Sequence, residues 1–261
     1  MAIVIKSPEE LEVMAEVGRL HTEIFAELES QIRPGVSTLE LEHWVRRAIQ
    51  ARGGTAPQIG YQGYPYATCM SLGEVVVHGF PSERPLQEGD LLKVDFAFGY
   101  RGFVTDMART YLVGGRGSEE AEALIRATEE AFWAGFDRMR PGTRIGDVSA
   151  AVQASLEARG YWVVREMVGH GVGRSMHEDP QVPNFGRPGT GPRLRAGMTL
   201  ALEPMVTLYP ASVVILSDGW TASSGRGNLA AHYENTVAVT EEGPRLLTGA
   251  LKERLSAPTS R

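Results

Sequence analysis

Two aspartates, Asp95 and Asp106, offer the first candidate chemistry in the chain. They lie in alternating apolar sequence on either side of a Gly-Tyr-Arg-Gly segment, residues 99–102, which predicts a β-hairpin. With the turn centred between Tyr100 and Arg101, the two aspartates would face each other directly across the ladder. Like charges placed in this way are destabilising, so a buried pair favours a bound divalent cation. The alternative is that one aspartate faces solvent or caps the turn.

Three further residues could join such a site. Glu203 ends an apolar segment before Pro204, Glu234 begins another apolar segment, and His170 lies in a glycine-rich Gly-His-Gly-Val-Gly segment. Glycines around a histidine indicate that backbone or ligand approaches closely. Taken with the aspartate pair, these residues are typical of a two-metal site. Taken singly, each glutamate could be a solvated charge at a strand edge, and the histidine could be structural.

Two other histidines could bind substrate or move a proton, because imidazole titrates near neutral pH. His78 lies in Val-His-Gly, and His177 follows His170 by seven residues in Met-His-Glu-Asp-Pro. A structural role stays open for both. We assign no role to the remaining histidines, His21, His43 and His232.

Capping boxes and Gly or Pro breaks predict four helices. Their expected spans are about 7–31, 37–53, 118–139 and 145–159, with extended segments after the second and the fourth. This order contains an internal repeat, because Arg-Pro-Gly at 33–35 recurs at 140–142 and Ala-Arg-Gly at 51–53 recurs at 158–160. The matching strands place Asp95 on Glu203. We therefore expect an α+β fold of two pseudo-symmetric halves, about 7–113 and 118–247, within a single domain 1–261, and we expect equivalent carboxylates to converge near the pseudo-axis.

Composition narrows the class of protein. A chain of 261 residues can bury a sizeable core, and a net charge of −6 argues against nucleic acid as the main ligand. Cys69 is the only cysteine, which excludes an internal disulfide and fits a reducing compartment. Neither a signal peptide nor an apolar segment of membrane-spanning length is present. We expect a soluble cytoplasmic protein.

Seven separated motifs make the chemistry specific, and the chain resembles the type I methionine aminopeptidases, which are pita-bread (creatinase-fold, M24) metallopeptidases. The resemblance extends from about residue 7 to residue 247. The motifs are Gly-Tyr-Gln-Gly-Tyr-Pro at 60–65, Val-His-Gly at 77–79, Gly-His-Gly-Val-Gly at 169–173, His-Glu-Asp-Pro at 177–180, Glu-Pro-Met at 203–205, Asp-Gly-Trp at 218–220 and Tyr-Glu at 233–234.

The resemblance implies a pita-bread fold with a curved antiparallel sheet and an enzyme that removes the initiator methionine when the second residue is small. It implies two divalent ions held by Asp95, Asp106, His170, Glu203 and Glu234. Asp106 would bridge the ions, and Glu203 would also act as general base toward the attacking water. His78 and His177 would contact the substrate backbone and stabilise the tetrahedral intermediate.

By the same resemblance, the methionine side chain would enter a pocket formed by Tyr61, Tyr64, Cys69 and Trp220. A thioether packs well against aromatic rings and sulfur, although such aromatics could also be ordinary core residues. Met176 and Gln58 would lie nearby. They depart from the enteric bacterial pattern, in which a Phe and a Cys are usual, and this affects the expected shape of the pocket.

Other members of the fold are the nearest alternatives. Prolidases and aminopeptidases P resemble the chain in the ligand set but usually carry an extra N-terminal domain. A non-catalytic peptide-binding module would typically lack some of the ligands, and a type II methionine aminopeptidase would carry an insertion that does not fit between His177 and Glu203.

The partners implied are the N-termini of nascent polypeptides near the ribosome, with no specific nucleic acid and no membrane, and the expected state is a monomer. The ligand types accept Co, Mn, Fe or Zn alike, so the metal stays open.

Overall fold

The structure is a computed structural model that describes residues 2–249. Its helices are α1 (Pro8–Glu29), α2 (Thr38–Ala51), α3 (Glu119–Phe136) and α4 (Ile145–Glu157), with short 3-10 turns at Tyr61–Gly63 and Val113–Gly115. The strands of the first half are β1 (Cys69–Leu72), β2 (Val75–Val77), β3 (Leu91–Tyr100) and β4 (Phe103–Leu112). Those of the second half are β5 (Trp162–Val163), β6 (Gly169–Gly171), β7 (Glu178–Val182), β8 (Thr199–Leu202), β9 (Met205–Thr207), β10 (Val214–Ile215), β11 (Ala222–Ser223), β12 (Ala230–His232), β13 (Glu234–Thr240) and β14 (Gly243–Leu246).

The first two helices begin at capping boxes, as expected. The Ser7 side chain accepts a hydrogen bond from the Glu10 backbone N–H, and the Glu10 carboxylate accepts one from the Ser7 N–H. Ser37 and Glu40 repeat this arrangement at α2. Each box satisfies backbone donors that no helical carbonyl can reach, so a short local motif is enough to define the start of the helix.

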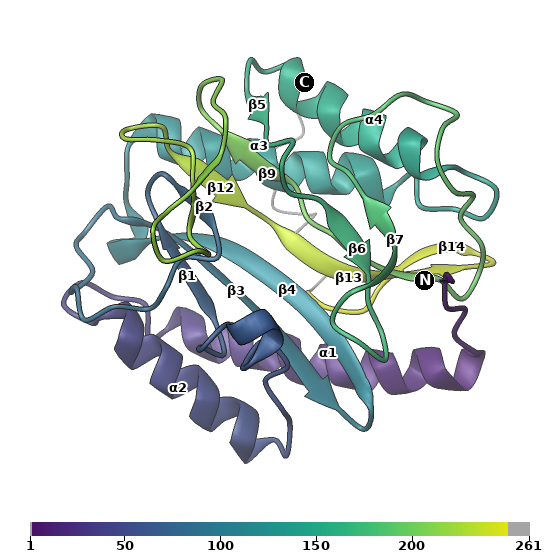
Figure 1. The fold of residues 1–261 in the computed structure, drawn as a ribbon, viewed down its shortest axis with the longest axis horizontal. Coiled ribbons are helices and arrows are strands. Elements are labelled where there is room, and N and C mark those ends of the chain that lie inside the picture. Colours follow the sequence, from purple (N-terminus) through teal and green to yellow (C-terminus); the bar gives the residue numbers. More distant parts are fainter. Residues whose placement is uncertain (1, 250–261) are drawn as a thin grey trace.

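A curved antiparallel sheet joins the two halves. Its strand order is β1-β3-β4-β13-β8-β6-β7, with β14 paired to β13, so β4 and β13 meet at the centre. In Figure 1, α1 and α2 lie below the central strands and α3 and α4 lie above them. A large apolar cluster joins α1 and α2 to β3 and β4, and another joins α3 and α4 to β8 and β13.

The β3–β4 hairpin forms where predicted, but the predicted register is wrong. Arg101 and Gly102 have φ values of 51° and 79° and form a two-residue turn, which pairs Tyr100 with Phe103. Asp95 therefore lies opposite Ala108 rather than opposite Asp106. Because the displacement is an even number of residues, both aspartates still project from the same face of the sheet.

Matching turns relate the two halves. Gly35 and Gly142 both have φ of 90°, and their N–H groups donate to the carbonyls of Leu86 (2.8 Å) and Leu194 (2.9 Å). These are the equivalent residues of the sequence repeat. Two helices followed by strands therefore occur twice around one sheet, which confirms the α+β fold with two pseudo-symmetric halves. Among residues 2–249, no helix is long and apolar enough to cross a membrane.

Candidate metal centre and substrate cleft

The pairing register of the central strands brings the four carboxylates that were predicted to bind metal close together. Ala108 of β4 lies between Asp95 of β3 and Glu234 of β13. Asn235 pairs with Leu202, so Glu203, the residue after β8, comes level with Glu234. Asp95, Glu234 and Glu203 thus occupy one row across the sheet, and β1 extends this row with Cys69, which pairs with Asp95.

A second row lies two residues along the strands. It contains Asp106, which pairs with Ala97, and His170, which pairs with Ala201. Thr236 joins them at the centre, since it also pairs with Ala201, and its hydroxyl accepts from the Asp106 N–H (2.8 Å) and donates to the Asp106 carbonyl (2.9 Å). The alanines in both rows leave space between the longer charged side chains. Because side chains two residues apart in a strand point to the same face, the residues of both rows project from one face of the sheet.

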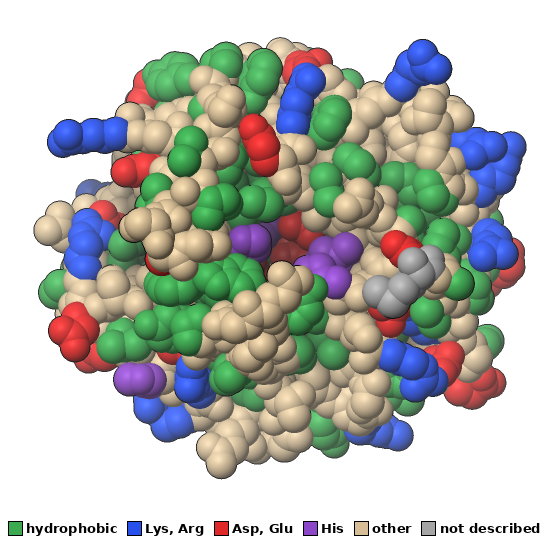
Figure 2. Space-filling model, viewed as in Figure 1, with side chains coloured by type: hydrophobic (Ala, Val, Ile, Leu, Met, Phe, Trp, Pro, Cys, Tyr) green, Lys and Arg blue, Asp and Glu red, His purple; other side chains and the backbone are tan. Residues whose placement is uncertain are grey.

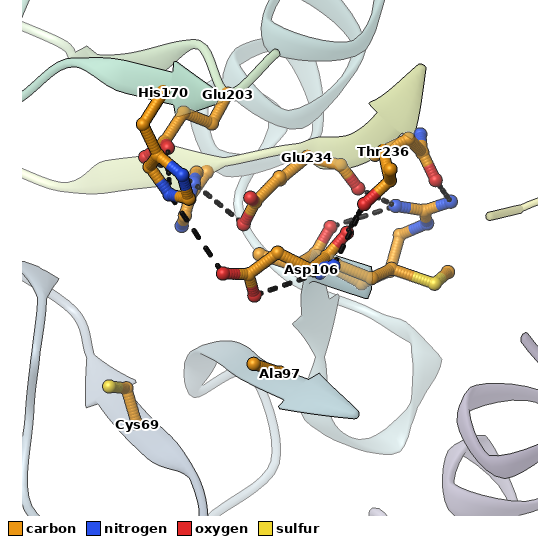
Figure 3. Close-up of polar contacts among 12 residues, drawn as sticks. Cys69, Ala97, Asp106, His170, Glu203, Glu234 and Thr236 are labelled. Carbon is orange, nitrogen blue, oxygen red and sulfur yellow. Dashed lines mark hydrogen bonds and ion pairs between the residues drawn. The ribbon is translucent and has the colours of Figure 1, made fainter. Parts of the chain in front are cut away.

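Figure 3 shows Asp106, Glu203, Glu234 and His170 converging from different strands. His170 Nε2 lies 3.4 Å from Glu203 Oε1 and 3.9 Å from Asp106 Oδ2. Backbone contacts anchor the two glutamates: Asn184 Nδ2 donates to the Glu203 carbonyl (2.9 Å), and Arg109 donates to the Glu234 carbonyl (2.7 Å). The converging side chains therefore come from fixed backbone positions.

Burial dominates the electrostatics of this cluster. Desolvation, with repulsion from neighbouring carboxylates, raises the pKa values of Asp106, Glu203 and Glu234 well above the ordinary range. Desolvation also raises the pKa of Asp95 to about 7 and lowers the pKa of His170 to about 3. Each group thus resists its charged form, and a cation bound among the carboxylates would favour their ionised form.

The donor set fits a divalent cation. Asp106, His170 and Glu234 offer one ligand atom each, and these atoms lie within 4.8 Å of one another. Glu234 Oε1 is buried and has no hydrogen-bond partner among the described residues. Carboxylate oxygens and an imidazole nitrogen are ligands that zinc and related ions accept.

One residue of the cluster was missed by the sequence analysis, which assigned no role to His232. Its ring is buried beside the glutamates, and Asp95, His232 and Glu234 form a second group whose ligand atoms lie within 4.8 Å of one another. Its position two residues before Glu234 was the only available signal. That spacing places both side chains on one side of an extended chain, although Tyr233 interrupts the strand between β12 and β13.

A cavity of about 320 Å³ opens over the cluster. Figure 2 shows a hollow at the centre of this face that contains acidic and histidine side chains and has hydrophobic side chains at its rim. The cavity lining includes all eleven predicted site residues: Tyr61, Tyr64, Cys69, His78, Asp95, Asp106, His170, His177, Glu203, Trp220 and Glu234. The structure therefore brings together every residue that the sequence analysis selected.

The two histidines predicted to contact substrate lie on the cavity wall. The His177 ring lies 4.1 Å from the His170 ring and 5.0 Å from the Tyr61 ring, measured between centroids. His78 has φ of 60°, which is rare for a residue other than glycine and is often found at functional sites. Burial lowers the pKa of His78 to about 4 and lowers the pKa of His177, so both rings are neutral near pH 7.

The predicted methionine pocket contains sulfur and aromatic groups, and polar contacts hold it in shape. The Tyr64 hydroxyl donates to the Thr68 carbonyl (3.0 Å), and its ring meets Trp220 edge to face at 5.0 Å. Gln58 Oε1 accepts from the Ala97 N–H (3.1 Å), and Gln58 Nε2 donates to Cys69 Sγ (3.4 Å). Gln58 and Met176 line the same cavity, so both departures from the family pattern change the surface of the pocket.

Comparison with known proteins agrees with this geometry. The model of metallopeptidase family M24 matches residues 12–241. A methionine aminopeptidase of Clostridium perfringens is 45% identical over 246 residues, which cover 94% of this chain and 98% of the relative. A crystal structure of methionine aminopeptidase from Thermotoga maritima superposes with a TM-score of 0.92 at 43% identity, covering 95% of this chain and all of that chain.

A prolidase from Pyrococcus furiosus shares the fold, with a TM-score of 0.77 at 22% identity, and this chain covers 66% of its length. The curved sheet with two related halves is thus the pita-bread fold common to these proteins. Near-complete coverage at high identity is found with methionine aminopeptidases. The chain therefore belongs to metallopeptidase family M24 and, within it, to the methionine aminopeptidases.

Proposed function

We propose that this protein hydrolyses the N-terminal methionine of polypeptides whose second residue is small. The observation that carries the proposal is the convergence of four carboxylates and His170 at the base of a cavity whose wall offers aromatic and sulfur groups. Asp95, Asp106, His170, Glu203 and Glu234 would hold two divalent ions from among Co, Mn, Fe and Zn. When bound, the ions would act as Lewis acids toward the scissile carbonyl and balance the carboxylate charge.

The protein residues then have distinct tasks. Glu203 takes a proton from the attacking water and passes it to the leaving amine, because its carboxylate is buried beside the reacting centre and can hold a proton there. His78 and His177 are neutral, so each can donate one N–H hydrogen bond to the substrate backbone or to the tetrahedral oxyanion. These two rings on the cavity wall would orient the peptide before attack.

Substrate choice follows from the shape of the cavity. The first side chain enters between Tyr61, Tyr64, Cys69 and Trp220, where a thioether meets sulfur and ring edges. A large second side chain would collide with the cleft wall while the scissile carbonyl is held in place. The polypeptide substrates we propose are nascent chains near the ribosome, and we propose a cytoplasmic monomer that binds neither nucleic acid nor membrane specifically. Residues 1–261 would form one catalytic domain from the repeats 7–113 and 118–247.

A tripeptide panel tests the function. Met-Ala and Met-Gly peptides should be cleaved fast, and Met-Leu and Met-Lys peptides slowly. Cleavage of Leu-Ala peptides should be about 10- to 200-fold slower than cleavage of Met-Ala peptides, because a small change in the side chain that enters an apolar pocket is worth about 1–3 kcal/mol. Preferred cleavage of Xaa-Pro peptides without methionine would instead establish a prolidase-type enzyme. Peptide binding without cleavage, at full metal occupancy, would establish a binding module.

A further inference from the structure

His232 is a buried histidine whose ring has no hydrogen-bond partner. The residue is 1% exposed, and neither Nδ1 nor Nε2 forms a hydrogen bond with any described residue. Its backbone is held independently, because its N–H donates to Thr110 Oγ1 (2.9 Å) and its carbonyl accepts from the same hydroxyl (2.8 Å). Burying polar atoms without partners costs stability, so a ligand bound at one of these ring nitrogens would offset that cost.

The ring faces the glutamates of the metal centre. His232 Nε2 lies 3.8 Å from Glu203 Oε2 and 3.8 Å from Glu234 Oε2. These separations are too long for hydrogen bonds. They are compatible with two atoms that bind the same ion, because two ligand atoms that each lie about 2.0–2.2 Å from a zinc ion can be no more than about 4.4 Å apart. The separation between His170 Nε2 and Asp106 Oδ2 is similar, at 3.9 Å.

We infer that His232 is a sixth donor of the metal centre, in addition to the five residues of the family pattern. Asp106, His170 and Glu234 form one triad of neighbouring donor atoms, and Asp95, His232 and Glu234 form the other. Each ion would then have its own imidazole, with Glu234 common to both triads. The inference rests on the metal centre proposed above and adds a ligand to it.

A second imidazole changes which metals the centre favours. Imidazole nitrogen suits zinc, cobalt and iron, whereas a site made only of carboxylates suits manganese and magnesium. The site that contains Asp95 and His232 should therefore favour Co²⁺ or Zn²⁺ over Mn²⁺ more strongly than the same site without His232. Replacing His232 by glutamine should remove this discrimination while leaving a side chain of similar length.

The test measures metal binding directly. Metal-free wild type, His232→Gln and the control His43→Gln, whose histidine is exposed on α2, are titrated with Co²⁺, Zn²⁺ and Mn²⁺ by calorimetry. We expect His232→Gln to weaken one of the two Co²⁺ and Zn²⁺ sites by at least about tenfold, a loss typical even of partners outside the ligand shell, with a smaller change for Mn²⁺. The visible spectrum of bound Co²⁺ should change in His232→Gln and not in His43→Gln.

X-ray absorption of the wild type loaded with two zinc ions provides a measurement that does not depend on how a variant folds. Two imidazoles per pair of ions support the inference. One imidazole per pair, or unchanged Co²⁺ affinities in a folded His232→Gln, overturns it and leaves the five-residue centre intact. A wild type that binds no divalent ion would overturn the metal centre itself, and with it the proposed function.

Discussion

His170 and Glu203 face each other across 3.4 Å, from His170 Nε2 to Glu203 Oε1; His170 lies within β6, and Glu203 directly follows the neighbouring strand β8. The other ring nitrogen, Nδ1, lies 2.9 Å from the Gly171 carbonyl, which can only accept. Burial keeps the ring neutral by lowering its pKa to about 3. A neutral ring that donates from Nδ1 presents an unprotonated Nε2 to carboxylate oxygens, an arrangement that is stable when a cation lies between them.

Metal removal should therefore affect both activity and stability. We expect exhaustive chelation to abolish peptide cleavage and to lower Tm by about 5–10 °C. A ligand at 100 times its Kd stabilises the native state by about 2.7 kcal/mol, and each kcal/mol shifts Tm by about 2–4 °C in a chain of this size. Melting curves and turnover, recorded with metal content measured on the same samples, check this. Full activity of a sample shown to be metal-free would contradict the metal centre.

Replacing Glu203 by glutamine should separate chemistry from binding. The amide keeps the size of the side chain but cannot accept a proton, and general-base catalysis typically contributes about 10²–10⁴-fold. We expect kcat to fall by at least this factor, with a much smaller change in KM. Steady-state kinetics at matched metal occupancy measure the effect. A Glu203→Gln enzyme within a few-fold of wild type, with metal bound, would assign the base to another residue, such as His177.

The N-terminal segment should stabilise the loop that carries His177. Lys6 Nζ lies 2.5 Å from Glu178 Oε2, and their side chains are 1% and 8% exposed. Glu178 Oε1 also accepts from the Arg174 N–H (2.7 Å) and so closes the loop before His177. Lys6→Met leaves a buried carboxylate without its cationic partner, so we expect a loss of about 3–5 kcal/mol in the free energy of unfolding.

Two comparisons make the Lys6 prediction specific. The double variant Lys6→Met/Glu178→Gln should recover part of the loss, because it removes the unpaired charge. Arg19→Met breaks the exposed pair of Arg19 with Glu23 on α1 and should cost no more than about 0.5 kcal/mol. Urea denaturation of the four proteins measures these values. Equal losses for Lys6→Met and Arg19→Met would show that the buried pair has no special weight.

His21 should make the protein less stable in acid. Its side chain is fully buried among Phe25, Phe96 and Phe98, and desolvation lowers its pKa to about 3. The unfolded chain takes up a proton below about pH 6.5 and the native state does not until about pH 3, so stability is lost as the pH falls through this window. At pH 5 the loss from this one group is about 2 kcal/mol.

The His21→Gln variant isolates that contribution. Between pH 7.5 and pH 5, wild type should lose about 2 kcal/mol more than His21→Gln, whereas the exposed control His43→Gln should follow wild type. Urea denaturation at the two pH values gives the difference. The same loss in wild type and His21→Gln would show that the ring takes up its proton while the protein is folded.

Local sequence was sufficient to predict the four helices and to select residues that the structure brings to one cavity. Ser7 with Glu10, and Ser37 with Glu40, define helix starts because a capping box satisfies its hydrogen bonds within four residues. The repeat of Arg-Pro-Gly predicted two related halves, because each glycine has a left-handed φ that few other residues adopt. Motif order selected Glu203 and Glu234 before their positions in space were known.

Only the tertiary structure decided how the charged groups meet. The register of β3 with β4 depends on whether the turn is centred after Tyr100 or after Arg101. The residues of the Gly-Tyr-Arg-Gly segment are compatible with both turns, so the prediction that Asp95 lies opposite Asp106 was wrong. The role of His232 was not predictable, because whether a ring nitrogen is paired depends on side chains from strands distant in sequence. Burial raises or lowers the pKa of each group in the cluster, and burial is a property of the packed sheet rather than of any segment of the chain.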